Sequence, residues 1–299
     1  MATTADVADR GALPQLKARD FKGPVDPDWC PGCGDFGVLA GLKRAAGILD
    51  IDPKDILVVS GIGCSSNLPG FFNSYGFHGL HGRSIPVASG AKLANSDLNV
   101  VVTGGDGDGY GIGLGHFIHV MRRNLDITYI VMDNGVYGLT TGQVAPTAEK
   151  GFKTKSSPEG VIETPINPIA LALVSGATFV SRAFSGDPIH MADVIASAIK
   201  HPGFSLVDVF SPCVTYNKIN TYEFYRPRIS KLDQTGHDTH SMEAAIKRSY
   251  EWGQKIPIGI FYQTERPTYE AEDAVLKNGP LIKQKPVARD PEILLREFM

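Results

Sequence analysis

A glycine-rich stretch that carries two acids is the part of this chain whose residue types most clearly suggest chemistry. Seven glycines lie among the thirteen residues from Thr103 to Gly115, directly after an apolar run. A strand that leads through a glycine-rich turn into a helix presents backbone N–H groups to an anion, which suggests a bound phosphate. No Gly-Lys-Ser/Thr of a Walker loop follows. Asp106 and Asp108 would repel a phosphate, so they imply a divalent cation between them and the ligand.

Asn134 is a second candidate ligand for that cation. It ends the next apolar run and follows Asp106 by 28 residues. Gly-Asp-Gly, a helix, a strand and then Asn at this distance resembles the thiamine diphosphate motif. The resemblance implies that the side chains of Asp106 and Asn134 and the backbone carbonyl of Val136 hold Mg²⁺, which prefers oxygen ligands. The alternative is an acidic loop that only caps the following helix, which requires one Asp and no array of glycines.

Four cysteines, the number that fills a tetrahedral thiolate site, form the second constellation. Cys30 and Cys33 make a C-x-x-C pair, whereas Cys64 and Cys213 each follow an expected strand at its carboxyl end. If the N-terminal pair folds over that edge of the sheet, all four thiolates can meet there. Zinc and a 4Fe–4S cluster fit the ligand count equally well, and burial as four separate small side chains is the remaining alternative. A position beside a thiamine site favours iron and sulfur, because zinc does not transfer electrons.

The elements that must position these groups follow a regular alternation. Apolar strands, the first two running into glycine turns, are expected at 55–64, 97–109, 126–134, 176–182 and 204–213, and helices at 35–49, 109–123, 167–177 and 187–201. Continuous apolar strands that alternate with helices are typical of a doubly wound, mostly parallel α/β sheet. Asp35 is expected to cap the first helix. After Tyr216 the alternation stops, and one helix is expected near 241–252.

Composition narrows the class of protein. The chain has 299 residues, 42% of them hydrophobic and 20% charged, which is ordinary for a globular protein. The net charge of −3 gives no electrostatic footprint for nucleic acid. No apolar run is long enough to span a membrane, and the first residues lack the apolar core of a signal peptide. These features predict a cytoplasmic protein that binds neither nucleic acid nor membranes.

Together these motifs resemble the β subunit of a 2-oxoacid:ferredoxin oxidoreductase of the two-subunit kind. The matching stretches, within about residues 29–217, are WCPGCGDFGVL, SGIGCSS, HGLHGRSIPVASGAKLAN, GGDGDGYGIG, HFIHVMRRNLDITYIVMDNGVYGLTTGQVAPT and SPCVTYN. The resemblance implies an N-terminal arm (1–28), a thiamine diphosphate domain with a 4Fe–4S cluster (29–217) and a C-terminal extension (218–299).

The implied activity is coenzyme A-dependent oxidative decarboxylation of a 2-oxoacid, or the reverse carboxylation, with single electrons passing through the cluster to ferredoxin. 2-Oxoglutarate is the favoured substrate, and pyruvate or a broad range of 2-oxoacids is the alternative. The family places the Glu that activates thiamine on an α subunit. We therefore expect this chain to be inactive alone and to assemble as a dimer of α–β heterodimers. A non-redox thiamine subunit and a zinc scaffold remain alternatives.

The resemblance also assigns site residues. The cluster ligands are Cys30, Cys33, Cys64 and Cys213. The residues expected to bind the cofactor are Gly63, Ser65, Ser66, His81, Gly105, Asp106, Gly107, Asp108, Asn134, Val136, Gly138, Leu139 and Thr140. For catalysis, His81 is a candidate contact of the reacting centre, Arg83 of a carboxylate, and Lys92 of substrate or cofactor charge. The alternatives are a supporting hydrogen-bonded loop for His81 and Arg83 and a surface position for Lys92.

Overall fold

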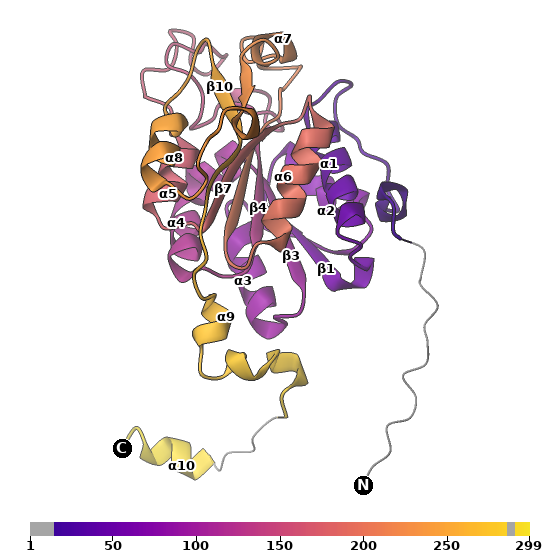
Figure 1. The fold of residues 1–299 in the computed structure, drawn as a ribbon, viewed down its shortest axis with the longest axis vertical. Helices are drawn as coiled ribbons and strands as arrows, with labels where there is room; N and C mark the ends of the chain where they lie inside the picture. Colours follow the sequence, from indigo (N-terminus) through magenta and orange to yellow (C-terminus); the bar gives the residue numbers. More distant parts are fainter. Residues whose placement is uncertain (1–14, 286–290) are drawn as a thin grey trace.

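An eight-stranded sheet forms the centre of the computed structural model, which describes residues 15–285 and 291–299 (Figure 1). Its strands, in spatial order, are β2 (Tyr75–His78), β1 (Ile56–Ser60), β3 (Asn99–Gly105), β4 (Thr128–Asp133), β8 (Ser205–Phe210), β7 (Phe179–Phe184), β10 (Ile256–Gln263) and β9 (Ile229–Lys231). All neighbours are parallel except β7 and β10. The predicted mostly parallel α/β sheet is confirmed. Residues 1–14 of the predicted N-terminal arm lie outside the described residues.

Helices cover both faces of this sheet (Figure 1). One face packs against α1 (Asp35–Ile48) and α6 (Pro188–Lys200), and the other against α3 (Ser84–Ala94), α4 (Leu114–Arg123), α5 (Pro168–Val174) and α8 (Met242–Ser249). Successive strand residues alternate between the two cores, since Val101 joins the first and Val102 the second. Burial on both faces explains why the strands are continuous apolar runs.

The order of the central strands decides where the functional segments meet. β1, β3, β4 and β8 are neighbours in the sheet and run parallel. Their carboxyl ends therefore lie along one edge. The segments that follow them carry Cys64, Asp106, Asn134 and Cys213 in that spatial order. Ligands of open α/β sheets bind in the crevice beyond this edge.

Three strands of the large sheet, β2, β9 and β10, lie where the sequence predicted none. β9 and β10 come from the expected C-terminal extension, and β10 pairs antiparallel with β7. Pro257 and Gly259 interrupt the pattern of β10, and Gly259 has a φ of +113°. Such residues weaken the strand signal in a sequence. The expectation of an extension with a single helix was thus wrong, although α8 confirms the helix near 241–252.

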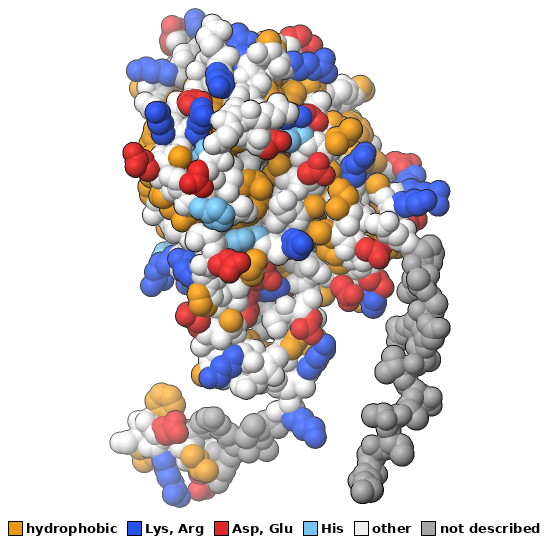
Figure 2. Space-filling view, in the orientation of Figure 1, with side chains coloured by type: hydrophobic (Ala, Val, Ile, Leu, Met, Phe, Trp, Pro, Cys, Tyr) orange, Lys and Arg blue, Asp and Glu red, His pale blue; other side chains and the backbone are white. Residues whose placement is uncertain are grey.

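Among the helices already described, α3 was not predicted from the sequence. The remaining α-helices and strands are short. They are α2 (Leu68–Phe71), β5 (Val136–Tyr137), β6 (Gln143–Val144), α7 (Tyr222–Tyr225), α9 (Tyr269–Glu272) and α10 (Pro291–Arg296). Among the described residues, none of the helices has the length and apolarity needed to cross a membrane. Figure 2 shows acidic and basic side chains intermixed over the visible face.

One predicted helix start and one predicted helix cap differ from the structure. The helix after the glycine-rich turn was expected from Gly109, but α4 begins at Leu114. The residues before it form a π-helical turn, in which the N–H of Gly113 donates to the carbonyl of Asp108 (3.0 Å). Such turns occur frequently at functional sites. Gly34, not Asp35, is the N-cap of α1, and Asp35 is instead buried in the first turn.

Candidate functional site

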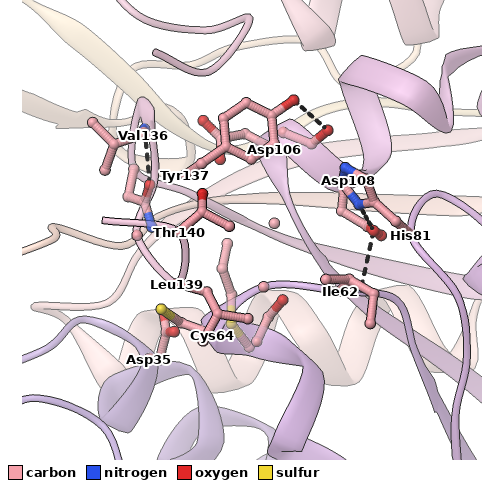
Figure 3. A pocket seen from close by; sticks show the side chains of 17 residues that line it. Asp35, Ile62, Cys64, His81, Asp106, Asp108, Val136, Tyr137, Leu139 and Thr140 are labelled. Atoms are coloured by element: carbon pink, nitrogen blue, oxygen red, sulfur yellow. Dashed lines mark hydrogen bonds and ion pairs between the residues drawn. The ribbon is translucent and has the colours of Figure 1, made fainter. Parts of the chain in front are cut away.

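A cavity of about 150 Å³ lies beyond the carboxyl ends of β1, β3 and β4 (Figure 3). Every residue predicted to bind the cofactor lines it except Ser66, whose hydroxyl donates to the carbonyl of Gly63 (2.5 Å). The other lining residues were not predicted to bind the cofactor, and they are Asp35, Ile62, Cys64, Met132 and Tyr137. Of these, Cys64 was expected as a cluster ligand and Asp35 as a helix cap. Residues that are distant in the chain thus meet around one cavity.

Asp106 and Asn134 face this cavity from neighbouring strands. The Asp106 Oδ2 atom accepts hydrogen bonds from the N–H of Gly135 (2.9 Å) and the hydroxyl of Thr147 (2.5 Å). The Asn134 Oδ1 atom accepts one from the N–H of Val136 (3.0 Å). Burial raises the pKa of Asp106 to about 6. A carboxylate and an amide oxygen together in one cavity suit Mg²⁺, which prefers oxygen ligands.

Thr147 connects two buried carboxyl groups, and no sequence pattern pointed to it. Its hydroxyl lies 2.5 Å from Asp106 and 2.8 Å from Oδ1 of Asp133. Burial raises the pKa of Asp133 well above its usual value, and the neighbouring carboxylates of Asp208 and Asp106 add to this rise. Asp133 is therefore favoured as the neutral acid. The charge that remains available for a cation at this end of the cavity is that of Asp106.

The Asp108 side chain is held by contacts with three other residues of the site. Its Oδ1 atom accepts from the N–H groups of Ile62 (2.9 Å) and Gly82 (2.7 Å) and lies 2.7 Å from Nδ1 of His81 (Figure 3). The His81 ring stands edge-on to Tyr137, with the ring centres 6.1 Å apart. With its Nδ1–H directed at Asp108, His81 keeps Nε2 as its other polar atom. Asp108 thus fixes the orientation of this ring.

Packing within the protein explains two of the glycines in the 103–115 stretch. A Cβ added at Gly107 would lie 2.4 Å from the ring of Tyr137, and one at Gly109 would lie 2.1 Å from the hydroxyl of Tyr129. The Tyr137 hydroxyl donates to the carbonyl of Gly107 (3.0 Å). Packing of these rings therefore requires glycine at both positions. Two buried atoms of the lining residues, the Ser65 hydroxyl and Oδ2 of Asp108, have no hydrogen-bond partner, and the unpartnered hydroxyl fits a ligand such as a phosphate.

Arg83 and Lys92 do not line the cavity. Arg83 precedes α3 and donates to the carbonyl of Gly82 (3.1 Å). Lys92 lies near the other end of α3, where it is 4% exposed and donates to Asp126 (2.7 Å) and to the carbonyl of Leu98 (2.9 Å). Both partners precede strands, so Lys92 lies at the amino edge of the sheet, opposite the cavity. The alternative of a surface position for Lys92 does not fit either, because the side chain is buried.

Replacement of Lys92 by methionine is expected to lower stability without affecting substrate binding. Methionine keeps the apolar stem but removes the donor to Oδ2 of Asp126 and to the Leu98 carbonyl, a loss of about 1–3 kcal/mol, or roughly 2–8 °C in melting temperature. Thermal unfolding and the KM for the 2-oxoacid, both measured on the assembled enzyme, check this. A raised KM at unchanged melting temperature would instead support a substrate role.

A second cavity, of about 230 Å³, is lined by all four cysteines. Each of them is a free thiol. A Cβ at Gly138 would lie 3.2 Å from the Cys64 sulfur and 3.8 Å from the Cys213 sulfur, so only the absence of a side chain there keeps the space between these sulfurs open. Burial raises the pKa of Cys64 to about 12 and also raises that of Cys33. The raised pKa values favour the protonated form of these two thiols.

The N-terminal C-x-x-C pair is held over the sheet edge by two contacts. The indole N–H of Trp29 donates to the carbonyl of Cys64 (2.6 Å), and the N–H of Gly34 donates to the carbonyl of Pro212 (3.1 Å). The expectation that this pair folds over the strand ends is thus met in the structure. Across residues 15–285 and 291–299, no group of three or more His, Cys, Asp or Glu side chains is arranged to hold a metal ion.

The two cavities adjoin each other. The residues that line both are Gly63, Cys64, Asn134, Gly138 and Leu139. A group in the cysteine-lined cavity would therefore lie within one layer of residues from a ligand beside Asp106. Asp35 lies close to both, since it lines the first cavity and its carboxylate raises the pKa of Cys33 in the second.

Known proteins match this chain over most of its length. Residues 61–209 match the C-terminal TPP-binding domain of thiamine pyrophosphate enzymes, and residues 213–278 match the C-terminal part of the pyruvate ferredoxin oxidoreductase beta subunit. The 2-oxoacid:ferredoxin oxidoreductase subunit beta of Saccharolobus solfataricus is 48% identical over 88% of this chain and 90% of its own length. The 2-oxoglutarate synthase subunit KorB of Archaeoglobus fulgidus is 44% identical over 78% and 83%, respectively.

A solved structure agrees in fold as well as in sequence. The 2-oxoglutarate:ferredoxin oxidoreductase from Magnetococcus marinus, determined with 2-oxoglutarate, coenzyme A and succinyl-CoA bound, superposes with a TM-score of 0.88. The two chains are 42% identical, and the match covers 96% of this chain and 97% of the other. The likeness therefore extends over the sheet, both cavities and the C-terminal strands.

Proposed function

The chain belongs to the beta subunits of the 2-oxoacid:ferredoxin oxidoreductases. From this premise we propose which cofactor each of its two cavities binds. The Asp106 cavity holds the diphosphate of thiamine diphosphate through Mg²⁺. The cysteine-lined cavity holds a 4Fe–4S cluster. The observation that carries this proposal is that five residues line both cavities, so electrons released at the first have a short path into the second.

For the magnesium site, the proposed ligands are the side chains of Asp106 and Asn134 and the carbonyl of Val136. Thiamine diphosphate, when bound, supplies the electron sink that loss of CO₂ from a 2-oxoacid requires. The residues of this chain bind and orient that cofactor. Asp106 supplies the negative charge for Mg²⁺, the unpartnered Ser65 hydroxyl is available to a phosphate oxygen, and Asp108 keeps the His81 ring at the cavity.

For the cluster, the proposed ligands are Cys30, Cys33, Cys64 and Cys213. The four cysteines line one cavity, and four cysteine ligands are the donor set of a 4Fe–4S cluster once they are deprotonated. Zinc takes the same number of thiolates, but electron transfer to ferredoxin, which the family name implies, requires a redox-active centre. The bare Gly138 backbone between the sulfurs of Cys64 and Cys213 leaves room for such a group.

The proposed reaction has a simple balance. One 2-oxoacid and one coenzyme A give one acyl-CoA, one CO₂ and one proton, while two electrons reduce two ferredoxins one at a time. We propose that an α subunit supplies the pyrimidine-binding domain and the activating Glu, and that two α–β pairs form the enzyme. Apolar side chains exposed near the Asp106 cavity, Leu80, Ile112 and Leu139, support a partner at this face.

2-Oxoglutarate is the proposed substrate. The KorB relative and the Magnetococcus marinus enzyme, which carries that acid, support this assignment. A second candidate is a broad range of 2-oxoacids, including pyruvate, because several relatives named only for 2-oxoacids are 45–50% identical to this chain. A ratio of kcat/KM for 2-oxoglutarate over pyruvate well above about tenfold supports the narrow assignment. A ratio near one supports the broad assignment.

Anaerobic purification together with the α subunit tests the proposed function. We expect a brown protein with about four irons per beta chain, whose absorption bleaches when 2-oxoglutarate and coenzyme A are added together. Omission of coenzyme A and use of the beta chain alone are the controls. A colourless protein that contains zinc or no metal would contradict the electron-transfer role and leave a thiamine enzyme without redox function.

A further inference from the structure

Asn217 is a buried residue that hydrogen-bonds to the segments of both proposed sites but lines neither cavity. It lies four residues after Cys213, is 2% exposed, and its backbone N–H donates to the Cys213 carbonyl (3.2 Å). Its Nδ2 atom donates to the backbone carbonyl of Asn134 (2.9 Å). The side chain thus links the segment of a proposed cluster ligand to the segment of two proposed magnesium ligands.

The peptide bond between Asn134 and Gly135 is held at both ends. Its carbonyl accepts from Asn217, and its N–H donates to Oδ2 of Asp106 (2.9 Å). Gly135 has a φ of +73°, a left-handed conformation that favours glycine. Rotation of this peptide would move the Asn134 side chain and the Val136 carbonyl, which lie on either side of it. The two hydrogen bonds therefore fix the direction in which both proposed ligands point.

The other contacts of Asn217 keep its own side chain in place. Its Oδ1 atom accepts from the N–H groups of Ile219 (3.0 Å) and Asn220 (2.9 Å). Its Nδ2 atom donates to Oδ1 of Asn220 (3.2 Å) as well as to the Asn134 carbonyl, so both ends of the amide are held. Asn220 in turn donates to Glu149 (3.0 Å), so the turn is anchored to a third segment. Such second contacts orient metal ligands and tune metal affinity.

We propose that Asn217 is a positioning residue that sets the Mg²⁺ affinity of the thiamine diphosphate site by fixing the Asn134–Gly135 peptide from the Cys213 segment. The inference rests on the proposed function of the Asp106 cavity. It assigns to Asn217 no contact with substrate, cofactor or metal. The Asn217–Asn134 hydrogen bond joins the segment that carries Cys213 to the segment that carries Asn134. It therefore connects the two cavities, which also have lining residues in common.

The decisive variant is Asn217→Asp. Aspartate keeps the shape and still accepts from Ile219 and Asn220, but it replaces the donor to the Asn134 carbonyl with an acceptor. Asn220→Asp is the control within the same buried turn. It keeps an oxygen that accepts from Asn217 Nδ2 and replaces only the donor to Glu149, and no hydrogen bond joins Asn220 to Asn134. Asn217→Ser, whose hydroxyl can also accept within the turn, is the second variant and removes the donor without adding charge.

The assembled enzyme, stripped of Mg²⁺ and thiamine diphosphate, is titrated with MgCl₂ at fixed thiamine diphosphate in a calorimeter. We expect Asn217→Asp and Asn217→Ser to weaken Mg²⁺ binding by about 10–100-fold, while Asn220→Asp stays within about threefold of the wild type. Saturating Mg²⁺ and cofactor should restore kcat, and the iron content should not change.

Equal Mg²⁺ affinity in the wild type and both Asn217 variants would overturn the inference, as would equal losses in Asn220→Asp. A kcat that stays low at saturating Mg²⁺ would also overturn it. If the wild-type enzyme binds no thiamine diphosphate, the proposed function itself fails, and the titration of the wild type alone reveals this. If Asn217→Asp does not assemble, Asn217→Ser carries the same comparison.

Discussion

Replacement of Asp106 by asparagine is expected to weaken the binding of Mg²⁺ and thiamine diphosphate by on the order of a thousandfold, and activity should fall with it. Asp106 is the charged group among the three proposed ligands, since Asn134 and Val136 offer neutral oxygens. Removal of one unit charge at close range costs about 4 kcal/mol at an effective dielectric constant of about 20. Asparagine keeps the shape and can still accept from Gly135 and Thr147. Calorimetry on the assembled enzyme measures the affinity.

The same variant should not be less stable than the wild type when metal and cofactor are absent. Burial raises the pKa of Asp106 from 3.8 to about 6, so the folded chain holds this proton more tightly than the unfolded chain. Stability therefore falls as the pH rises from about 4 through about 6, and above that range the ionised Asp106 destabilises the metal-free fold. At about pH 7.5, neutral asparagine should raise the melting temperature or leave it unchanged.

Asp97→Asn is the matched control for Asp106. It removes the same charge from a half-exposed acid that pairs with Lys283 (2.5 Å), away from the cavity. It should bind Mg²⁺ and cofactor as the wild type does. Binding by the Asp106 variant within tenfold of the wild type would contradict the ligand role. A lower melting temperature without metal would show that the substitution acts on folding instead.

Replacement of Cys213 by serine is expected to remove or degrade the cluster and to lower ferredoxin reduction by at least about a hundredfold. Cys213 lies three residues after the end of β8, is 9% exposed, and has its sulfur near Gly138, as Cys64 does. A hydroxyl of the same shape does not replace a thiolate as a ligand of iron. Iron content, the absorption spectrum and the rate of ferredoxin reduction check the prediction.

The thiamine site provides the internal control for this variant. Because its Mg²⁺ ligands come from other strands, the affinity for thiamine diphosphate should change little when Cys213 is serine. Tyr216→Phe, in the same segment and also lining the cysteine cavity, should keep its iron and its rate. A serine variant that retains full iron and reduces ferredoxin normally would remove Cys213 from the ligand set. Loss of both cofactors together would indicate that the substitution disrupts the structure at the carboxyl edge of the sheet, and not only that one cluster ligand is missing.

The sequence by itself determined the fold class and the edge at which the chemistry lies. Continuous apolar strands that alternate with helices predict a parallel sheet, and in such a sheet the residues that follow strands share one edge. Asp106, Asn134, Cys64 and Cys213 each directly follow a strand or lie a few residues beyond one. That they share one edge could therefore be predicted without knowledge of the strand order, whereas their closeness along that edge depends on β1, β3, β4 and β8 being neighbours.

Only the tertiary structure decided which other side chains reach that edge. Lys92 and His81 lie in the same stretch, HGLHGRSIPVASGAKLAN. The α3 helix nevertheless runs back along the sheet and places Lys92 at the opposite edge, where its side chain pairs with Asp126. Asp108 lines the cavity, and the structure adds that its carboxylate accepts from two backbone N–H groups and contacts His81. These outcomes depend on the direction of a helix and on backbone partners, which residue type does not encode.

Residues far along the chain complete the site for the same reason. Asn217 lies 83 positions from Asn134, and Thr147 lies 41 positions from Asp106, at spacings that no local periodicity marks. β9 and β10 likewise enter the sheet through pairing with distant partners, although Pro257 and Gly259 weaken their local signal. Local sequence determines which segments form strands and which groups end them. Long-range packing determines which side chains then hold those groups in place.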